Sequence, residues 1–158
     1  MGVQELPGHF INVGILYYTI GWNFVLKSST IQMMNTNQTI KVLIIDDDDT
    51  ITGLLTRMME FAGFEAYAEN SGLAGVEAVR RLNPDVVVLD LMMPGMSGWD
   101  VCKEIRTFSQ VPILVLSAVT DSQLVMQSLE NGANGYLVKP VPEKVLVSHI
   151  RELLGRTH

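Results

Sequence analysis

Four aspartates in a row, Asp46 to Asp49, follow a short run of apolar residues, although like charges placed side by side repel one another. Three more polar side chains stand at the ends of other apolar runs: Asp90, Ser117 and Lys139. An unpaired charge buried at such a position costs roughly several kcal/mol. The pattern therefore indicates a site whose charged groups neutralise one another or a bound ligand.

The types of these residues suit transfer of a phosphoryl group to a carboxylate. Asp90 would be the nucleophile, Lys139 would place a positive charge on the phosphoryl oxygens, and Ser117 would donate a hydroxyl hydrogen bond. Converging carboxylates need a cation, so Asp46 and Asp47 are predicted to bind a divalent ion together with Asp90. Oxygen ligands that leave room for water and phosphate favour Mg²⁺.

Predictions can also be made for three residues that adjoin these candidates in the chain. Asp49 is predicted to cap the first helix, where the helix dipole stabilises a negative charge, whereas Asp48 has no predicted chemical role. Pro140 makes the peptide bond that follows Lys139 a candidate for cis geometry, which would aim the lysine inward.

The elements that must position these residues follow from the apolar pattern. From residue 41 onward, short apolar runs alternate with segments of helical period, which is typical of an α/β fold with helices on both faces of a parallel sheet. The predicted strands are 42–45, 64–68, 86–89, 113–116 and 135–138. The polar residues follow four of these strands, so one edge of the sheet is predicted to gather them.

The intervening helices have recognisable signals. The first has an apolar stripe and is predicted to end before Gly63; the stripe consists of Ile51, Leu54, Leu55, Met58 and Met59. Ser71, Ser97 and Asp121 are predicted to cap the next three helices, and Pro142 to lie in the first turn of the last one.

Composition excludes several functions. The chain has 158 residues, 11 basic and 17 acidic, and a net charge of -6, so it lacks the broad positive surface of nucleic-acid-binding proteins, and no direct contact with nucleic acid is expected. A single cysteine, Cys102, excludes an internal disulfide and fits a reducing, cytoplasmic setting. The three histidines, His9, His149 and His158, have no spacing suited to zinc.

Residues 1–38 are predicted to form an extension outside the fold, and residues 39–158 the domain. Residues 10–26 are uncharged and mainly apolar, but short and interrupted for a membrane span. Two interpretations remain open. The stretch is an extension, for example one translated upstream of a natural start at Met33 or Met34, or it is a membrane anchor.

Residues 40–155 resemble the receiver domain of a two-component response regulator. The resemblance rests on four strings in the family's order, VLIIDDD, VVVLDLMMPGMSGWD, VPILVLSA and GYLVKP. It implies a CheY-like, flavodoxin-like doubly wound sheet of five parallel strands in the order 2-1-3-4-5, with five helices.

The resemblance also implies roles for individual residues. Asp90 would be the phosphoacceptor and Asp47 a direct magnesium ligand. Asp46 would assist Asp47 partly through water, and the backbone carbonyl of Met92 would be a further ligand. Lys139 and Ser117 would contact the phosphoryl group, as their chemistry suggests.

The remaining implications concern switching. Tyr136 would turn inward when Ser117 shifts toward the phosphoryl group, and Ala118 would be the small residue over the opening of the acid pocket. The face formed by the fourth helix, the fifth strand and the last helix would then contact a downstream protein or a second copy of the chain. Met92 and Val119 are apolar where family members can carry polar side chains that orient water, which predicts a slowly hydrolysed aspartyl phosphate.

The function implied is that of a phosphoacceptor in a phosphorelay, not of an enzyme. A sensor histidine kinase or a phosphotransfer protein would deliver phosphate to Asp90 in the presence of Mg²⁺. The altered face would then change a contact with a downstream protein target.

Two alternatives come from other classes. Residues 46–50 also satisfy the DxDxT pattern of haloacid-dehalogenase-like phosphatases, in which Asp46 would attack phosphate and Asp48 would act as acid and base. That function leaves Asp90 without a role. The second alternative is a pseudo-receiver that binds partners without being phosphorylated, against which the intact set of acids, hydroxyl and lysine argues.

Overall fold

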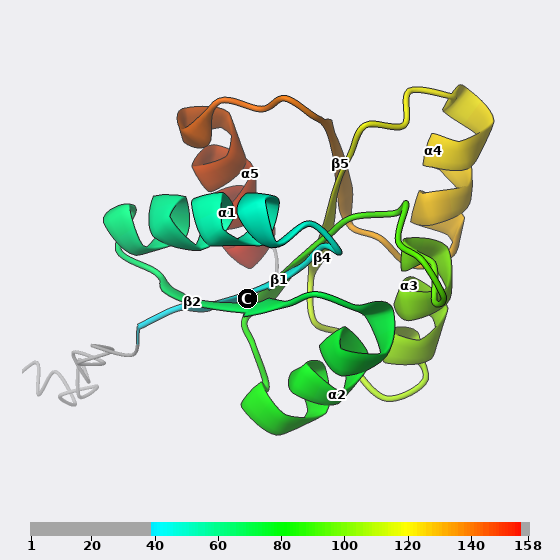
Figure 1. Ribbon diagram of the computed structural model, residues 1–158, viewed down its shortest axis with the longest axis horizontal. Helices are drawn as coiled ribbons and strands as arrows, with labels where there is room; N and C mark the ends of the chain where they lie inside the picture. The colour runs from blue at the N-terminus through cyan, green and yellow to red at the C-terminus, as the bar shows by residue number, and fades with distance from the viewer. Residues whose placement is uncertain (1–38, 156–158) are drawn as a thin grey trace, which may run out of the picture. The chain divides into compact units, whose positions relative to one another are not determined.

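The computed structural model describes residues 39–155, which form a five-stranded parallel sheet with five helices (Figure 1). The strands are β1 Lys41–Ile45, β2 Glu65–Glu69, β3 Val86–Leu89, β4 Ile113–Ser117 and β5 Gly135–Val138. Their order is β2-β1-β3-β4-β5. The predicted fold class and strand order are confirmed, and every strand lies within one residue of its predicted bounds.

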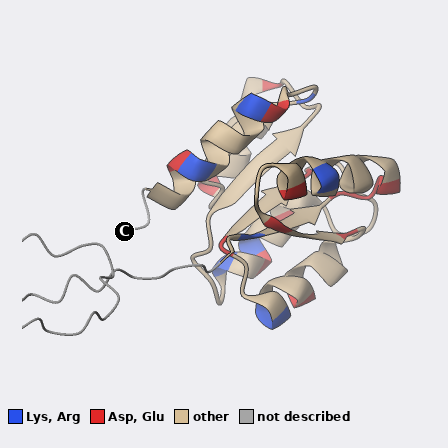
Figure 2. Cartoon of the chain, turned by 90° about the vertical axis from the view of Figure 1, so that its left-hand side faces the viewer, with Lys and Arg blue, Asp and Glu red and all other residues tan. Residues whose placement is uncertain are grey.

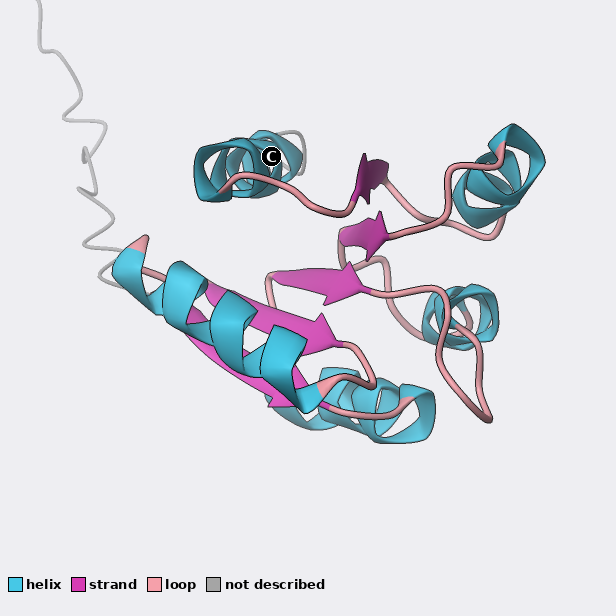
Figure 3. Cartoon of the chain, turned by 45° about the horizontal axis from the view of Figure 1, so that its top comes forward, coloured by secondary structure: helices cyan, strands magenta, loops and turns pink. Residues whose placement is uncertain are grey.

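Five helices alternate with the strands: α1 Asp49–Phe61, α2 Gly72–Leu82, α3 Gly98–Arg106, α4 Ser122–Glu130 and α5 Glu143–Gly155. Helices α1 and α5 lie on one face of the sheet, and α2, α3 and α4 lie on the other (Figures 1 and 3). Because successive side chains of a strand point to opposite faces, each central strand supplies two cores. In β1, Leu43 and Ile45 face α2 and α3, whereas Val42 and Ile44 face α1 and α5.

Side chains cap the helices at positions that are mostly as predicted. Ser71, Ser97 and Asp121 accept hydrogen bonds from the first turns of α2, α3 and α4. The prediction for α1 was wrong, because the cap is Asp48 and not Asp49. Asp48 has an extended backbone, which lets its carboxylate accept from the amides of Thr50 and Ile51 at 2.8 and 3.3 Å.

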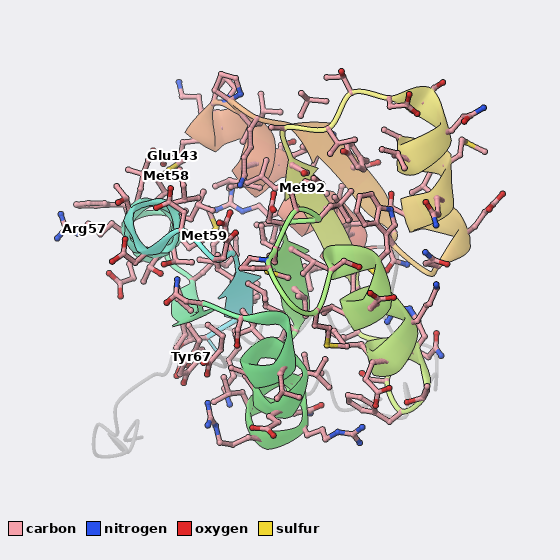
Figure 4. All side chains as sticks on the ribbon, turned by 45° about the vertical axis from the view of Figure 1, so that its right-hand side comes forward. Arg57, Met58, Met59, Tyr67, Met92 and Glu143 are labelled. Carbon is pink, nitrogen blue, oxygen red and sulfur yellow. The ribbon has the colours of Figure 1, made fainter. Side chains whose placement is uncertain are left out.

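The apolar stripe predicted for α1 is also only partly buried. Leu55 and Met59 are buried against the sheet, but Leu54 is 56% exposed. Leu54 lies one residue, or about 100°, away from the buried line, at the rim between α1 and the segment that follows β5. Arg57 points away from the sheet and Met59 toward it (Figure 4).

The described residues also bear on the predictions about Cys102, surface charge and membrane spans. Cys102 is buried in the core, and burial raises the pKa of its thiol to about 11, partly offset by Arg106. Acidic and basic residues are interspersed along the helices rather than gathered by sign in the view of Figure 2. None of the helices in residues 39–155 is long and apolar enough to cross a membrane. The predictions for residues 1–38 lie outside the described residues.

Candidate functional site

The polar residues that end four strands meet at the carboxyl edge of the sheet. Parallel pairing brings the strand ends together: the amide of Asp90 donates to the Ile45 carbonyl at 2.9 Å, and the amide of Lys139 donates to the Ser117 carbonyl at 3.0 Å. The order of the strands therefore places Asp46 and Asp90 side by side, with Ser117 and Lys139 next to them.

A three-residue ion cluster forms the centre of the site. The Nζ atom of Lys139 lies 2.5 Å from Oδ2 of Asp46 and 3.2 Å from Oδ1 of Asp90. Both carboxylates are buried, with 4% and 6% of their residue surfaces exposed. Burial by itself lowers the pKa of Lys139, but hydrogen bonding to Asp46 and the charges of Asp90 and Asp46 outweigh it, so that this pKa is raised above 10.5.

Backbone amides hold the remaining carboxylate oxygens. Oδ1 of Asp46 accepts the Asp48 amide at 3.0 Å, and Oδ2 of Asp90 accepts the Met92 amide at 2.7 Å. Each carboxylate is thus fixed on one side by the loop that follows its strand and on the other by Lys139. This arrangement orients Asp90 before any substrate arrives.

Ser117 contributes an unusual hydroxyl. It is fully buried, and its Oγ atom makes no hydrogen bond of ordinary geometry. The hydroxyl nevertheless lies near that of Tyr136: burial raises the pKa of this tyrosine, and Ser117 partly offsets the rise. An unsatisfied buried polar group costs about 1–3 kcal/mol, so it calls for a specific reason. A ligand oxygen bound beside the ion cluster would satisfy it.

The residues predicted to switch or to control access lie around Ser117. The hydroxyl of Tyr136 donates to the Val119 carbonyl at 2.7 Å, and burial raises the pKa of this tyrosine. Ala118 follows Ser117 at the surface. The cis peptide bond predicted between Lys139 and Pro140 is present.

The expected convergence of three carboxylates is not seen in the described part of the chain. No three acidic, histidine or cysteine side chains there are grouped as metal ligands, and Asp47 is exposed. The donor set nevertheless fits a hard cation. Two buried carboxylates share one ammonium group, which leaves a charge of −1. Asp47 directly follows Asp46, and Met92 lies two residues after Asp90, so both would supply further oxygen donors from the same loops. Metal binding stays a prediction.

Two structural residues of the site were not found from the sequence. Gly98 packs so closely on the loop after β3 that a Cβ atom there would lie 2.2 Å from the Asp90 carbonyl oxygen. Asn70 donates to the Asp46 carbonyl and to the Thr52 hydroxyl, both at 3.0 Å. A glycine four residues after a turn proline is a weak sequence signal, and Asn70 has none, because its partners are distant in the chain.

The contacts of Asp48 bear on the phosphatase alternative. That mechanism needs the Asp48 carboxylate to exchange protons with a substrate. Here the same carboxylate caps α1, while Asp46, the proposed nucleophile of that mechanism, is paired with Lys139. The geometry therefore favours Asp90 as the reacting carboxylate.

Comparison with known sequences agrees with this geometry. The model of the family described as the response regulator receiver domain matches residues 42–151. The DNA-binding response regulator MtrA of Mycobacterium tuberculosis is 43% identical over 116 residues, which cover 73% of this chain and 51% of MtrA. The transcriptional regulatory protein CseB of Streptomyces avermitilis is 44% identical over 115 residues, 73% of this chain and 49% of CseB. The chain thus spans about half the length of these curated relatives.

Solved structures give the same result. A putative response regulator from Chloroflexus aurantiacus superposes with a TM-score of 0.71 at 33% identity, covering 75% of this chain and 100% of that one. The BeF3-activated N-terminal receiver domain of RstA from Klebsiella pneumoniae superposes with a TM-score of 0.69 at 31% identity, covering 72% and 97%.

Proposed function

Since the chain belongs to the family of response regulator receiver domains, which act in two-component signalling, we propose that Asp90 accepts a phosphoryl group from a phosphohistidine. One observation carries this proposal. Lys139 joins Asp90 to Asp46 beside a buried Ser117 hydroxyl that has no partner. A phosphoryl group on Asp90 would give both Lys139 and Ser117 new oxygen acceptors.

The transfer needs little beyond positioning and charge neutralisation. A carboxylate oxygen of Asp90 forms the bond to phosphorus while the phosphorus–nitrogen bond of the donor breaks and its electron pair returns to the imidazole. Lys139 neutralises charge on the phosphoryl oxygens, and Ser117 donates a hydrogen bond to one of them. The backbone amide of Met92 keeps the carboxylate in place.

Asp46, Asp47, Asp90 and the carbonyl of Met92 would hold Mg²⁺. When bound, the ion would neutralise charge on the carboxylates and on the phosphoryl oxygens. In this proposal the protein accepts and hydrolyses only the phosphoryl group on Asp90 and turns over no other substrate. It is therefore a signalling phosphoacceptor and not an enzyme.

Exposed apolar residues beside the site support a protein as phosphodonor. A cavity of about 300 Å³ lies between α1 and the segment after β5, and its lining includes Leu54, Met58, Lys139 and Val141. Met92, on the loop after β3, is 62% exposed (Figure 4). Such a rim would receive a sensor histidine kinase or a phosphotransfer protein whose histidine reaches Asp90.

A second apolar surface supports the proposed output. Side chains of α4, β5 and α5 are exposed although apolar: Leu124, Met126, Leu129, Val138 and Val145. Tyr136 lies in the same region, so a change in its position would alter this surface. We propose that it contacts a downstream protein or a second copy of the chain, without direct contact with nucleic acid.

Incubation of the protein with acetyl phosphate and Mg²⁺ tests the proposal. We expect intact-mass spectrometry to show the gain of one phosphoryl group, and addition of EDTA to prevent it, because the crowded carboxylates would then lack their cation. A protein that gains no phosphoryl group from acetyl phosphate or from a phosphorylated histidine kinase would contradict the proposed function.

The lifetime of the phosphorylated form is a further prediction. Met92 and Val119 have no polar group with which to orient an attacking water, so hydrolysis of the aspartyl phosphate is expected to be slow. We expect Met92→Asn to shorten the half-life, measured as loss of the phosphoryl mass after the donor is removed. The control is Met126→Asn, which changes an exposed methionine on α4 instead of the loop after β3 and should leave the half-life unchanged. A wild-type half-life shorter than that of Met92→Asn would refute this explanation.

A further inference from the structure

Trp99, in the first turn of α3, connects this helix to α4. Its indole Nε1 atom donates a hydrogen bond to the backbone carbonyl of Leu124, at a distance of 3.2 Å. The ring itself packs against the core beneath α2 and α3. The side chain thus belongs to α3, but its polar atom reaches the next helix.

The α3 end of this connection is closely packed against the loop after β3. Gly98, the residue before Trp99, donates its amide to the Leu91 carbonyl at 2.9 Å and leaves no room for a Cβ atom against the Asp90 carbonyl. The start of α3 is therefore in direct contact with the backbone of Asp90 and Leu91. Trp99 follows directly in the same turn of helix.

The α4 end is loosely held. Ser128 is the only residue of α4 that is buried, and its hydroxyl bonds within the helix to the Val125 carbonyl at 2.6 Å. Leu124, Met126 and Leu129 are all exposed by more than a third. An element with few buried apolar contacts is easily displaced, so a single well-placed hydrogen bond carries weight there.

Two side chains from other elements donate to the segment after Ser117. Tyr136 donates to the Val119 carbonyl near its beginning, and Trp99 donates to the Leu124 carbonyl in the first turn of α4. Tyr136 was predicted to take part in switching from the family resemblance.

We propose that Trp99 is a positioning residue that anchors α4 in the arrangement seen here, and that a phosphoryl group on Asp90 disfavours this arrangement. The proposal rests on the proposed function of Asp90. If one arrangement loses a partly exposed hydrogen bond, the equilibrium between two arrangements shifts by about two- to fivefold. Removal of the indole N–H should therefore make binding of a phosphoryl mimic tighter, not weaker.

Titration of the full chain with beryllofluoride and Mg²⁺ tests this proposal. We expect Trp99→Phe, which keeps an aromatic ring but removes the N–H group, to lower the apparent dissociation constant about two- to fivefold, the worth of one such bond. Trp22→Phe, the same substitution outside the described residues, should leave the constant unchanged. A residue that only supports the fold would weaken binding when replaced, so an unchanged or raised constant in Trp99→Phe overturns the proposal.

A second measurement needs no substitution. In the wild-type protein, the indole ¹H–¹⁵N signal of Trp99, identified by its absence in Trp99→Phe or by its contact with Leu124, should shift when beryllofluoride binds. A bound protein with an unshifted signal would also overturn the anchor. If wild-type protein binds no beryllofluoride, the proposed function fails. Faster hydrogen exchange of α4 amides in Trp99→Phe then still tests whether the anchor exists.

Discussion

We expect Asp90→Asn to abolish incorporation of phosphate and binding of beryllofluoride and to leave the protein folded. Asn has no carboxylate oxygen able to form the acyl phosphate, so intact-mass spectrometry should show no phosphoryl gain under conditions that modify the wild-type protein. The fold should persist because the amide oxygen can still accept the Met92 hydrogen bond and Lys139 keeps its ion pair with Asp46. Thermal unfolding measured with and without Mg²⁺ checks this second part.

The charge balance of the site makes the same substitution informative about the metal. Two buried carboxylates share one ammonium, and Asp90→Asn leaves a balanced pair of Lys139 and Asp46. Without Mg²⁺ the variant should be at least as stable as the wild type, and Mg²⁺ should stabilise it less, because one negative ligand is gone.

Asp85→Asn is the matched control for both measurements. Asp85 immediately precedes β3, whereas Asp90 follows it. Asp85 is exposed and accepts the Lys41 amide at 2.7 Å. This variant should incorporate phosphate like the wild type. Phosphate found on the Asp90→Asn protein would mean that another carboxylate is the nucleophile, with Asp46 the first to test.

Lys139→Met has the largest expected effect on stability. Methionine fills the space of the lysine stem but leaves the Asp46 and Asp90 carboxylates buried without a cation. Breaking a buried ion pair from one side costs about 3–5 kcal/mol, and we expect about 2–3 kcal/mol here because the lysine side chain is 24% exposed. Urea denaturation measures the loss, and Mg²⁺ should restore part of it by neutralising the same carboxylates.

Lys144→Met provides the comparison, since Lys144 is an exposed lysine on α5. Its replacement should change the free energy of unfolding by less than about 0.5 kcal/mol. Equal stability of the two variants would show that Lys139 does not neutralise the buried carboxylates. Beryllofluoride binding should also be lost in Lys139→Met only.

The stability that Lys139 supplies depends on pH with a definite sign. Its pKa in the folded protein is raised above the usual 10.5, because Asp46 and Asp90 outweigh the opposing effect of burial. A raised pKa means that the stabilisation is fully present below pH 10.5 and is lost as the pH rises through the folded-state value. The difference between wild type and Lys139→Met should therefore be constant near neutral pH and shrink in strongly alkaline solution.

Much of the fold could be predicted from local signals. Apolar runs of four or five residues followed by polar residues define the strands within one residue, because a central strand of a parallel sheet is buried on both faces. Ser71, Ser97 and Asp121 were recognised as caps because a short polar side chain before an apolar period has few other uses.

The errors arose where two neighbouring residues compete for one position. Asp48 and Asp49 are chemically identical, and only the extended backbone at Asp48 decides which carboxylate reaches the free amides of α1. Leu54 belongs to the apolar period of α1 yet is exposed, because the period of a helix does not say how wide a stripe the neighbouring elements cover.

By itself, the sequence determined the fold class, the strand positions and the choice of Asp90, Ser117 and Lys139 as candidate functional residues. A polar residue at the end of an apolar run can be recognised from its immediate neighbours in the chain. Only the tertiary structure decided that Lys139 bridges Asp46 and Asp90, that the Ser117 hydroxyl lacks a partner, and that Trp99 reaches α4. The physical reason is that a hydrogen bond depends on the relative placement of two elements to within a few tenths of an ångström. Residue types and spacing along one chain do not contain that distance.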